Sequence, residues 1–421
     1  PLLRVGLLQH QNQVYFMVGG PFSIFRKDGK FIVRVLKGHR WRADIIDIKP
    51  AVIEYRLRYW MTSDHKLAFE KSHELAEKNL RPEILQFAAG NARWKLTRLR
   101  KMIYHVVLWR IFDTREAAEA MQKQLAAKVH LEVMPVTKVP AGGTIEITNL
   151  ESGKRWRFPS GSRIVTDRFA LLNVPVGEGF HWENRRDEVF RGNLELLIDQ
   201  EKKLTAVDEL PLESYLRGVV PSEMHANFPL EALKAQAIAA RSQVLVNAGR
   251  KHLDEDFDVC ATVHCQVYSG MMKEAKSTDR AIKETAGLVL FSQSQIVEGV
   301  YSGVCGGQTE NNENVWNGNP MPHLRGVFDG EGPPGLLDNY LQDEARLRRW
   351  IAKRPPVFCN NLEAQVPEAM VYTRKYFRWQ QTETRLALSG YIRQATGENF
   401  GQLKDILPLE RGVSGRLRRI R

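Results

Sequence analysis

Apolar and polar residues alternate along the first sixty residues, around short turns at Gly19-Gly20 and Asp28-Gly29. Alternation with a period of two is typical of strands that bury one face, and glycine-containing turns between such runs favour β-hairpins. The pattern predicts a buried face made of Val5, Leu7, Tyr15, Met17, Phe31 and Val33. We therefore expect residues 1–60 to be a β-rich segment that forms part of the core.

The pattern changes after residue 60. Leu67–Asn79 has a helical period, Met102–Phe112 is rich in strand-forming residues, and Thr114–Leu125 is amphipathic with Thr114 as a capping residue. We expect residues 61–135 to be an inserted α/β unit. The stretch VVLWRIFDTREAAEAMQKQL in it resembles a SPOR-type wall-binding repeat, although a generic βα unit explains the same pattern.

Short alternating segments return between Glu132 and Leu204, which indicates more antiparallel sheet. A helical block follows over Pro229–Ala248, then a second helix over Ser277–Ala286 and a hairpin over Leu288–Tyr301. The predicted fold class is therefore α+β, with mixed, largely antiparallel sheets and a few helices. We expect residues 136–421 to form a third segment, and the motifs that it carries make it the candidate catalytic core.

Composition narrows the class of protein. Of the 421 residues, 43% are hydrophobic and 26% are charged, as in an ordinary soluble globular protein. No apolar run reaches the roughly 18 residues of a membrane span, so no transmembrane segment is expected. The formal charge of +12 favours polyanionic partners such as cell-wall polymers. Since no zinc-finger, helix-turn-helix or RNA-binding signature accompanies that charge, we do not expect nucleic acid as a partner.

The ends of the sequence indicate a processed or trimmed chain. It opens with Pro1-Leu2-Leu3 and has neither an initiator Met nor a secretory signal. It stops just after Leu417–Ile420, which has the pattern of a new strand. We expect a signal or anchor to lie outside this sequence and the catalytic core to be truncated at its C-terminus.

Glu223 is the principal catalytic candidate. It lies in Pro-Ser-Glu-Met between Pro221 and Pro229, where we expect a strand to end and a helix to begin, so that the catalytic Glu lies at a strand-to-helix junction. A general acid needs a raised pKa, which an apolar wall of Val219, Val220, Met224 and Phe228 would supply. A capping or surface role for Glu223 remains the alternative.

Two basic residues on the following helix are candidates for substrate binding. Lys234 and Arg241 are seven positions apart, so both lie on one face of the helix. They would bind sugar hydroxyl or acetamido groups if that face borders the cleft. The alternative is an ordinary solvated or salt-bridged face. Gln236 lies on a different face and ranks lower.

A cluster of sulfur and imidazole groups follows in KHLDEDFDVCATVHCQVYSG. Its four members match the ligand types of a zinc site: His252, Cys260, His264 and Cys265. Disulfides or free thiols are the alternatives, since the cysteine count is even and Cys305 and Cys359 are available to form a bridge. With four protein ligands and no H-E-x-x-H motif, such a zinc would be structural or site-shaping. No organic cofactor is expected.

The segment Val300–Trp316 combines paired glycines with polar and aromatic side chains. Paired glycines let a backbone approach a ligand closely, and Trp offers a stacking face for a sugar ring. The candidate substrate-binding residues there are Tyr301, Ser302, Gly306, Gly307, Thr309 and Trp316. The alternatives are a tight turn with Trp316 in the core, and a Cys-His nucleophile built on Cys265 or Cys305.

Three of these motifs, in this order, resemble the stage II sporulation protein D family, also called the SpoIID/LytB or amidase-enhancer family. Glu223 stands at the Glu of the family's VVxSEM motif, and Val300–Trp316 is similar to its YxSxxGGxT…W stretch. Gln266 and Tyr268 match its Q-x-Y stretch, which implies that both line the same cleft. The resemblance covers residues 160–330, with looser matches to the family's opening strand and its late RGxSGR turn.

The resemblance implies a peptidoglycan lytic transglycosylase in the cell envelope, outside the cytoplasm. Such an enzyme cleaves the MurNAc–GlcNAc bond of glycan strands, denuded ones included, and forms 1,6-anhydro-MurNAc. Glu223 would be its general acid and base, and a His/Cys zinc site beside this Glu occurs in some members. The alternative is a non-catalytic peptidoglycan-binding module that stimulates a cell-wall amidase.

Overall fold

The computed structural model describes residues 2–36, 38–62, 64–88, 102–177, 179, 183–248, 250–293, 295–316, 320–332, 336, 340–362 and 366–421. The chain forms two compact units, residues 1–299 and residues 300–421, which we call unit 1 and unit 2. Each unit is described by itself. No helix within the described part of the chain is both long and apolar enough to cross a membrane.

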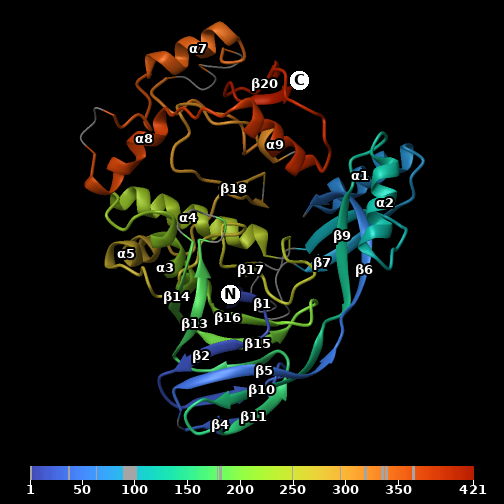
Figure 1. Cartoon of the computed structure of the whole chain (residues 1–421), viewed down its shortest axis with the longest axis vertical. Coiled ribbons are helices and arrows are strands. Elements are labelled where there is room, and N and C mark those ends of the chain that lie inside the picture. Colours follow the sequence, from blue (N-terminus) through green and yellow to red (C-terminus); the bar gives the residue numbers. More distant parts are fainter. Residues whose placement is uncertain are drawn as a thin grey trace. The chain divides into compact units, whose positions relative to one another are not determined.

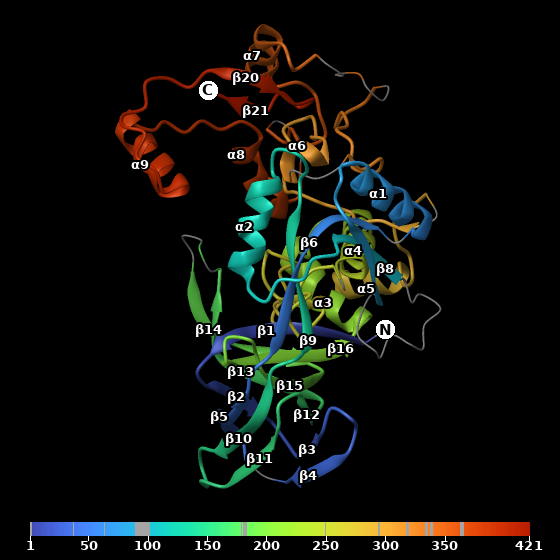
Figure 2. The ribbon, with the colours of Figure 1, turned by 90° about the vertical axis from the view of Figure 1, so that its right-hand side faces the viewer.

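Unit 1 contains a seven-stranded sheet at its centre. Its strands, in spatial order, are β17 (Val259–Cys260), β1 (Leu2–Gln11), β16 (Leu204–Pro211), β15 (Asn193–Ile198), β12 (Ser162–Val165), β3 (Phe22–Phe25) and β4 (Phe31–Val35). All neighbours are antiparallel except β1 and β17, which run parallel. Figure 2 shows β1 and β16 side by side below helix α3.

A second sheet packs against the first and encloses the main core. Its strands are, in order, β11 (Arg155–Pro159), β10 (Gly142–Asn149), β5 (Arg40–Lys49), β2 (Val14–Val18), β13 (Arg168–Val176) and β14 (Asn184–Arg191). Trp41 of β5 is fully buried, and its ring meets that of Phe22 on β3 with centroids 5.3 Å apart. This edge-to-face contact joins the two sheets.

The buried face of the N-terminal hairpins differs from the predicted one. Val5 and Leu7 are buried as expected, but Tyr15 is 38% exposed and Phe31 is 59% exposed. On β2 the core residues are Val14, Phe16 and Val18. Because β2 is apolar at all five positions, alternation alone cannot tell which face turns inward.

A smaller α/β layer is inserted between the strands of the second sheet, in residues 52–139, and we call it the inserted layer. It has a four-stranded sheet in the order β7 (Pro82–Ala88), β8 (Met102–Leu108), β6 (Val52–Thr62) and β9 (Glu132–Val139). Helices α1 (His65–Glu77) and α2 (Arg115–Leu125) cover it (Figure 1) and share one apolar cluster with it. Thr114 caps α2 by accepting from the Ala117 N–H, as predicted. Wall binding by this layer stays a prediction.

Three helices pack on the end of the seven-stranded sheet. They are α3 (Leu212–Glu223), α4 (Leu230–Asn247) and α5 (Lys276–Glu284), and the short hairpin β18 (Phe291–Ser292) and β19 (Gln295–Ile296) follows. The α+β class with largely antiparallel sheets is thus confirmed. The strand expected just before Glu223 is instead α3, because β16 already ends at Pro211. The buried pair Val219-Val220 has strand-like composition but packs as a helical stripe.

Unit 2 is irregular and has a small core. Its elements are α6 (Asn312–Trp316), α7 (Glu344–Lys353), the 3-10 helix η2 (Glu368–Thr373), α8 (Arg374–Phe377), α9 (Arg385–Thr396), β20 (Pro408–Arg411) and β21 (Leu417–Ile420). Leu341 and Leu347 form its buried apolar cluster, against which Phe328 and Trp350 pack. The predicted turn before Leu417–Ile420 therefore joins two paired strands.

Candidate functional site

Glu223 is the last residue of α3 and lies half-buried where the chain turns toward α4. The preceding residues Val219, Val220 and Pro221 are buried, so the end of the helix is anchored in the core. Met224 and Phe228, expected in the same apolar wall, are partly exposed. Pro229 precedes the first turn of α4. The side chain of Glu223 therefore projects from a rigid base.

The backbone of Val267 holds this carboxylate. The Val267 N–H donates to Glu223 Oε1 at 2.7 Å, across 44 residues of sequence. A bond from a fixed main-chain donor orients one carboxylate oxygen. The segment around Val267 is therefore the element that positions Glu223.

Gln266 and Tyr268 flank Val267 but are buried, 2% and 3% exposed. The Tyr215 hydroxyl of α3 donates to Gln266 Oε1 at 3.3 Å, and the Tyr268 hydroxyl donates to Asp208 Oδ2 at 2.8 Å. Burial raises the pKa of Asp208 well above its usual range. Both residues thus belong to the support beneath Glu223, and Tyr268 also bounds a cavity beside it.

Gly218 allows α3 to approach this support closely, because it has no side chain. A Cβ at this position would lie 2.5 Å from both the Gly270 carbonyl oxygen and the Tyr268 ring. Such distances are impossible without a shift of the backbone. Gly218 is therefore required for α3 to pack on residues 266–270, and so for Glu223 to reach Val267.

The four predicted metal ligands come together immediately before this segment. The ligand atoms of His252, Cys260, His264 and Cys265 all lie within 4.8 Å of one another. His252 Nε2 is 3.3 Å from Cys265 Sγ, and His264 Nδ1 is 3.6 Å from Cys260 Sγ and 3.8 Å from Cys265 Sγ. Zinc–ligand bonds of roughly 2.0 to 2.3 Å in a tetrahedron place nitrogen and sulfur about 3.5 Å apart. The four residues therefore fit a single tetrahedral ion.

The surroundings of the cluster also suit a metal. His252 Nδ1 is hydrogen-bonded to Glu255, as metal-binding histidines commonly are to a carboxylate. Burial opposes the charged imidazole, but bonds with Cys260 and Glu255 outweigh it and raise the pKa of His252 to about 9, so an ion bound here would displace a proton from this imidazole. The bond with Cys265 lowers the pKa of Cys260, which makes a thiolate ligand easier to form.

The cluster is fastened at both ends. Cys260 lies on β17, which pairs with β1, and the Ala261 N–H donates to the Gly6 carbonyl at 3.0 Å. Cys265 lies two residues before Val267, and the Tyr268 N–H returns to the Ala261 carbonyl at 3.0 Å. An ion bound here would therefore fix the loop that presents the Val267 N–H to Glu223.

Arg241 is engaged inside the protein and not at a cleft. Its side chain is buried, 1% exposed, and its Nε and Nη2 donate to the two oxygens of Glu213 at 2.9 and 2.8 Å. Nη1 donates to the Leu288 carbonyl at 3.0 Å. The structure thus gives Arg241 the task of joining α4 to α3, in place of the expected contact with sugar, because burial closes it to a ligand.

Lys234 takes the salt-bridged alternative. Its Nζ lies 2.8 Å from both Glu231 and Glu284, and the hydrogen bond that it donates to Glu231 is the first cause of its raised pKa. Gln236, ranked lower from the sequence, is 5% exposed. Neither Lys234 nor Gln236 therefore has a free side chain directed at a cleft, as a sugar-binding face of α4 would require.

The remaining predicted substrate-binding residues belong to unit 2: Tyr301, Ser302, Gly306, Gly307, Thr309 and Trp316. Trp316 is 59% exposed and Tyr301 is 38% exposed, which excludes the alternative of a core Trp. Gly306 and Gly307 have φ values of 78° and 102°, conformations that favour glycine. Their role beside Glu223 stays a prediction.

The bridge between Cys305 and Cys359, one of the alternatives that the sequence left open, is not formed in this structure. Both cysteines are free, and their sulfurs are 3.6 Å apart with Asp329 Oδ2 at 3.2 Å from Cys305 Sγ. A disulfide requires about 2.05 Å. The even number of cysteines indicated that Cys305 and Cys359 could lie together. Nothing in the sequence indicated that Asp329 lies beside them.

Two cavities lie in unit 1, and one of them adjoins the Glu223 support. One of about 470 Å³ is bounded by Val267, Tyr268 and Ser269 and includes the basic residues Arg186 and Lys273. It offers cationic and apolar surface beside the segment that holds Glu223. Sequence reasoning missed it because its walls come from β13, β14 and the loop after the metal cluster.

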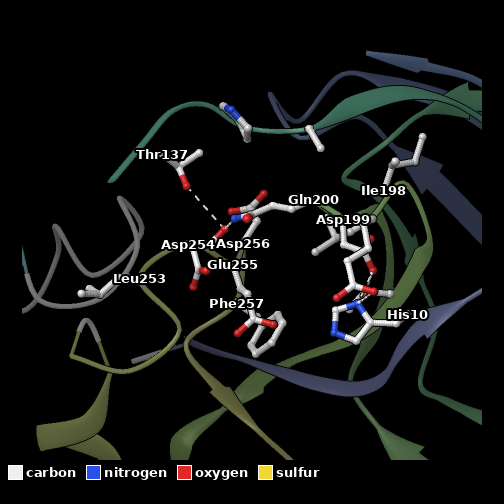
Figure 3. A pocket seen from close by; sticks show the side chains of 15 residues that line it. His10, Thr137, Ile198, Asp199, Gln200, Leu253, Asp254, Glu255, Asp256 and Phe257 are labelled. Atoms are coloured by element: carbon white, nitrogen blue, oxygen red, sulfur yellow. Dashed lines mark hydrogen bonds and ion pairs between the residues drawn. The ribbon is translucent and has the colours of Figure 1, made fainter. Parts of the chain in front are cut away.

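The other cavity, of about 510 Å³, is acidic. Asp254, Glu255 and Asp256 lie together on the loop after His252, and Asp199 lies beside His10 (Figure 3). The run LDEDFD was the available signal for it, since a cluster of carboxylates on one loop makes a negative surface. Glu255 connects this wall to the metal cluster through His252.

Comparison with known proteins finds a matching family model within each unit. Residues 200–291 match the family described as "Stage II sporulation protein", and residues 310–421 match a domain of unknown function (DUF8618). The first match contains Glu223 and all four members of the His/Cys cluster.

Curated relatives match part of the chain. An uncharacterized protein of Brachyspira hyodysenteriae is 36% identical over 171 residues, 39% of this chain and 46% of its own length. Bacillus subtilis supplies two more: the amidase enhancer, 36% identical over 118 residues (28% and 16%), and stage II sporulation protein D, 35% identical over 137 residues (29% and 39%). The matches span less than half the length of each of these relatives.

Proposed function

We propose, on the premise that residues 200–291 match the stage II sporulation protein family, that the chain is a peptidoglycan lytic transglycosylase. Its substrate is the MurNAc–GlcNAc bond of glycan strands, denuded strands included. Glu223 is the general acid and base. We also propose that it acts in the cell envelope.

One observation carries this proposal: the Val267 N–H holds the half-buried Glu223 carboxylate at 2.7 Å on a rigid helix end. A catalytic acid must be kept in reach of the proton acceptor in a fixed direction. A surface or capping Glu needs no such support from a buried loop. The close packing of Gly218 and the two buried residues Gln266 and Tyr268 thus support the segment that holds this carboxylate.

The reaction needs only one carboxyl group. Glu223 donates its proton to the glycosidic oxygen as the bond from that oxygen to C1 of MurNAc breaks. The C6 hydroxyl of the same MurNAc forms the new bond to C1 and returns its proton to Glu223. The product is a 1,6-anhydro ring, water is not consumed, and Glu223 ends in its starting protonation state. Ordinary glycosidases use a second carboxylate to handle water.

Zinc is the ion that we propose for the four-donor cluster. His252, Cys260, His264 and Cys265 would hold it, and a closed set of four protein ligands supplies structural cross-linking and not a reactive water. The residues of the chain then do the chemistry: the fixed loop keeps the Val267 N–H on Glu223. Loss of the ion would act on Glu223 through this loop.

The second candidate is a non-catalytic module that binds peptidoglycan and stimulates an amidase. It is supported by the similarity to a protein named amidase enhancer. In that case Glu223 would be a structural residue, and its replacement would leave stimulation intact. The formal charge of +12 supports wall binding under both candidates.

An assay with purified denuded glycan strands distinguishes the lytic transglycosylase from the non-catalytic module. The wild type should release 1,6-anhydro-ended sugars, detected by mass spectrometry, and Glu223→Gln should lower the rate by about 10²- to 10⁴-fold. Glu231→Gln is the matched control, because this Glu is 82% exposed on α4 and should leave the rate unchanged. Sedimentation with the wall without any cleavage by the wild type, together with stimulation of an amidase, would replace the proposal with the second candidate.

A further inference from the structure

Unit 2 carries a second cluster of metal-ligating groups, separate from the one beside Glu223. The ligand atoms of Cys305, Asp329 and Cys359 all lie within 4.8 Å of one another. The two sulfurs are 3.6 Å apart, and Cys305 Sγ is 3.2 Å from Asp329 Oδ2. Three chain segments, 24 and 30 residues apart in sequence, therefore converge on one point.

The spacing of the donors matches a shared ion. Two thiolates at about 2.3 Å from a tetrahedral zinc are about 3.8 Å apart, close to the observed 3.6 Å. A covalent bridge would instead bring the sulfurs to about 2.05 Å. The carboxylate oxygen on the same side completes a set of three anionic donors.

Main-chain bonds hold the three donors in this arrangement. The Gly307 N–H donates to Cys305 Sγ at 3.4 Å, and the Asp329 N–H donates to the Gly307 carbonyl at 3.0 Å. The Phe358 N–H donates to the Asp329 carbonyl at 2.8 Å, one residue before Cys359. Because the backbones are joined to each other, the donors stay together even before an ion binds.

The surroundings offset the negative charge of such a set. Arg416 Nη2 donates to the Cys305 carbonyl at 2.7 Å, and Arg378 Nη1 donates to the Gly306 carbonyl at 3.1 Å. Two thiolates and a carboxylate exceed the charge of a divalent ion by one unit. The two guanidinium groups lie where that excess develops.

Unit 2 also lacks the apolar core that would hold it together without a cross-link. Among its described residues, the buried hydrophobic side chains are Leu341, Leu347, Val357 and Phe377. A small core is commonly supplemented by a metal or by disulfides. Gly307 packs directly on this core, since a Cβ there would lie 2.8 Å from Trp350 and 3.2 Å from Val357. An ion held by Cys305 and Cys359 would therefore reinforce the core at its edge.

We propose that Cys305, Asp329 and Cys359 bind a thiophilic divalent cation, zinc foremost, with the fourth position left to water or to an oxygen of a ligand. The ion clamps the Gly306-Gly307 turn that precedes the exposed Trp316. The proposal is independent of the function proposed for Glu223, because it concerns unit 2 alone.

Metal analysis of the full chain tests the proposal. The protein is purified without chelator or reductant, given zinc, freed of excess, and measured by inductively coupled plasma mass spectrometry. We expect two equivalents per chain, one lost in the Cys305→Ser/Cys359→Ser variant and the other in Cys260→Ser/Cys265→Ser. In the cobalt-substituted protein, the sulfur-to-cobalt band should fall by about half in each variant, since each removes two of the four cysteines.

A milder variant covers the case in which the double variant fails to fold. Asp329→Asn keeps both cysteines and should release one equivalent to a competing chelator at least about tenfold more readily. Asp405→Asn, an exposed Asp in the same unit, is the control and should behave as wild type. A second equivalent that persists unchanged in Asp329→Asn overturns the proposal. A Cys305–Cys359 disulfide peptide from the zinc-treated protein overturns it as well.

Discussion

The two units hold their functional segments by different physical means. Unit 1 surrounds two sheets with an extensive buried core, in which Trp41, Phe16 and Phe169 are almost fully enclosed. Unit 2 has a buried apolar cluster of two leucines supported by Phe328 and Trp350. Packing fixes Glu223 in unit 1, whereas polar contacts fix the segment Val300–Trp316 in unit 2. This difference indicates which kind of substitution destabilises each unit: loss of buried groups in unit 1 and loss of hydrogen bonds in unit 2.

A partly buried carboxylate acts as the polar clamp of unit 2. Glu310 accepts from the Val413 and Ser414 N–H groups at 3.2 and 3.1 Å and from the Ser414 hydroxyl at 2.5 Å. The Asn314 amide adds a fourth bond at 2.8 Å. This clamp ties the Gly-Gly segment to the RGVSGR turn.

The largest expected effect is a loss of stability in acid, which His105 of the inserted layer causes. His105 is fully enclosed, and burial, followed by the charges of Arg58 and Arg250, lowers its pKa to about 3. The unfolded chain takes up a proton at this residue near pH 6.5, but the folded chain does not. The contribution of His105 to the free energy of unfolding is therefore complete above pH 6.5 and is lost as the pH falls below this value. Between pH 7 and pH 4 the loss amounts to about 3 kcal/mol.

Urea unfolding at several pH values measures this effect. His105→Asn should flatten the pH dependence of the free energy of unfolding, because the titrating group is gone. His39→Asn, an exposed histidine, should keep the full slope. Equal slopes for wild type and His105→Asn would show that this residue does not govern the acid lability of unit 1.

The second effect concerns the ion pair between α3 and α4. Glu213→Gln leaves the enclosed guanidinium of Arg241 without its counter-charge, and we expect unit 1 to lose about 2 kcal/mol. Thermal unfolding measures the loss, with Glu231→Gln as the exposed control. A Glu213→Gln protein as stable as the control would mean that Arg241 is not held as described.

A third effect is confined to unit 2. Burial opposes the charged form of Glu310, but bonds from Ser414 and Asn314 outweigh it and lower the pKa of this carboxyl group. Glu310 therefore stabilises unit 2 at a pH above the pKa that it has in the unfolded chain, and this stabilisation is lost in acid. Glu310→Gln should cost about 1 to 2 kcal/mol, because the amide accepts less strongly. Hydrogen exchange at Val413 and Ser414 should speed up while unit 1 stays protected. Equal acceleration in both units would contradict the comparison.

The smallest effect is expected at Lys234. Because its ion pairs are exposed, Lys234→Ala should change neither the melting temperature nor the rate of glycan cleavage measurably. A rise in KM with unchanged kcat would instead restore Lys234 as a substrate-binding residue. The assay with denuded strands provides both parameters.

The sequence pattern predicted what depends on local periodicity and on ligand chemistry. The N-terminal hairpins, the capped helix after Thr114 and the helical block after Pro229 all form as expected. The four His and Cys residues also come together as expected, because metal ligands are recognisable by type even at unusual spacing.

Features set by long-range packing could not be predicted in this way. The Val219-Val220 pair favours a strand by composition, yet tertiary contacts with residues 266–270 make it helical. The burial of Arg241 depends on Glu213, which lies 28 residues away. The role of Asp329 beside the two cysteines depends on a backbone pairing with Gly307 that has no local signal.

Isotope labelling during the reaction gives the most direct test of the role of Glu223. Denuded glycan strands are cleaved in water enriched in ¹⁸O, and the new MurNAc ends are analysed by mass spectrometry. Because the C6 hydroxyl is the proposed nucleophile, every new end should lack one water and carry no ¹⁸O, and Glu223→Gln should yield almost none. New reducing ends that contain one ¹⁸O would show hydrolysis and contradict the account.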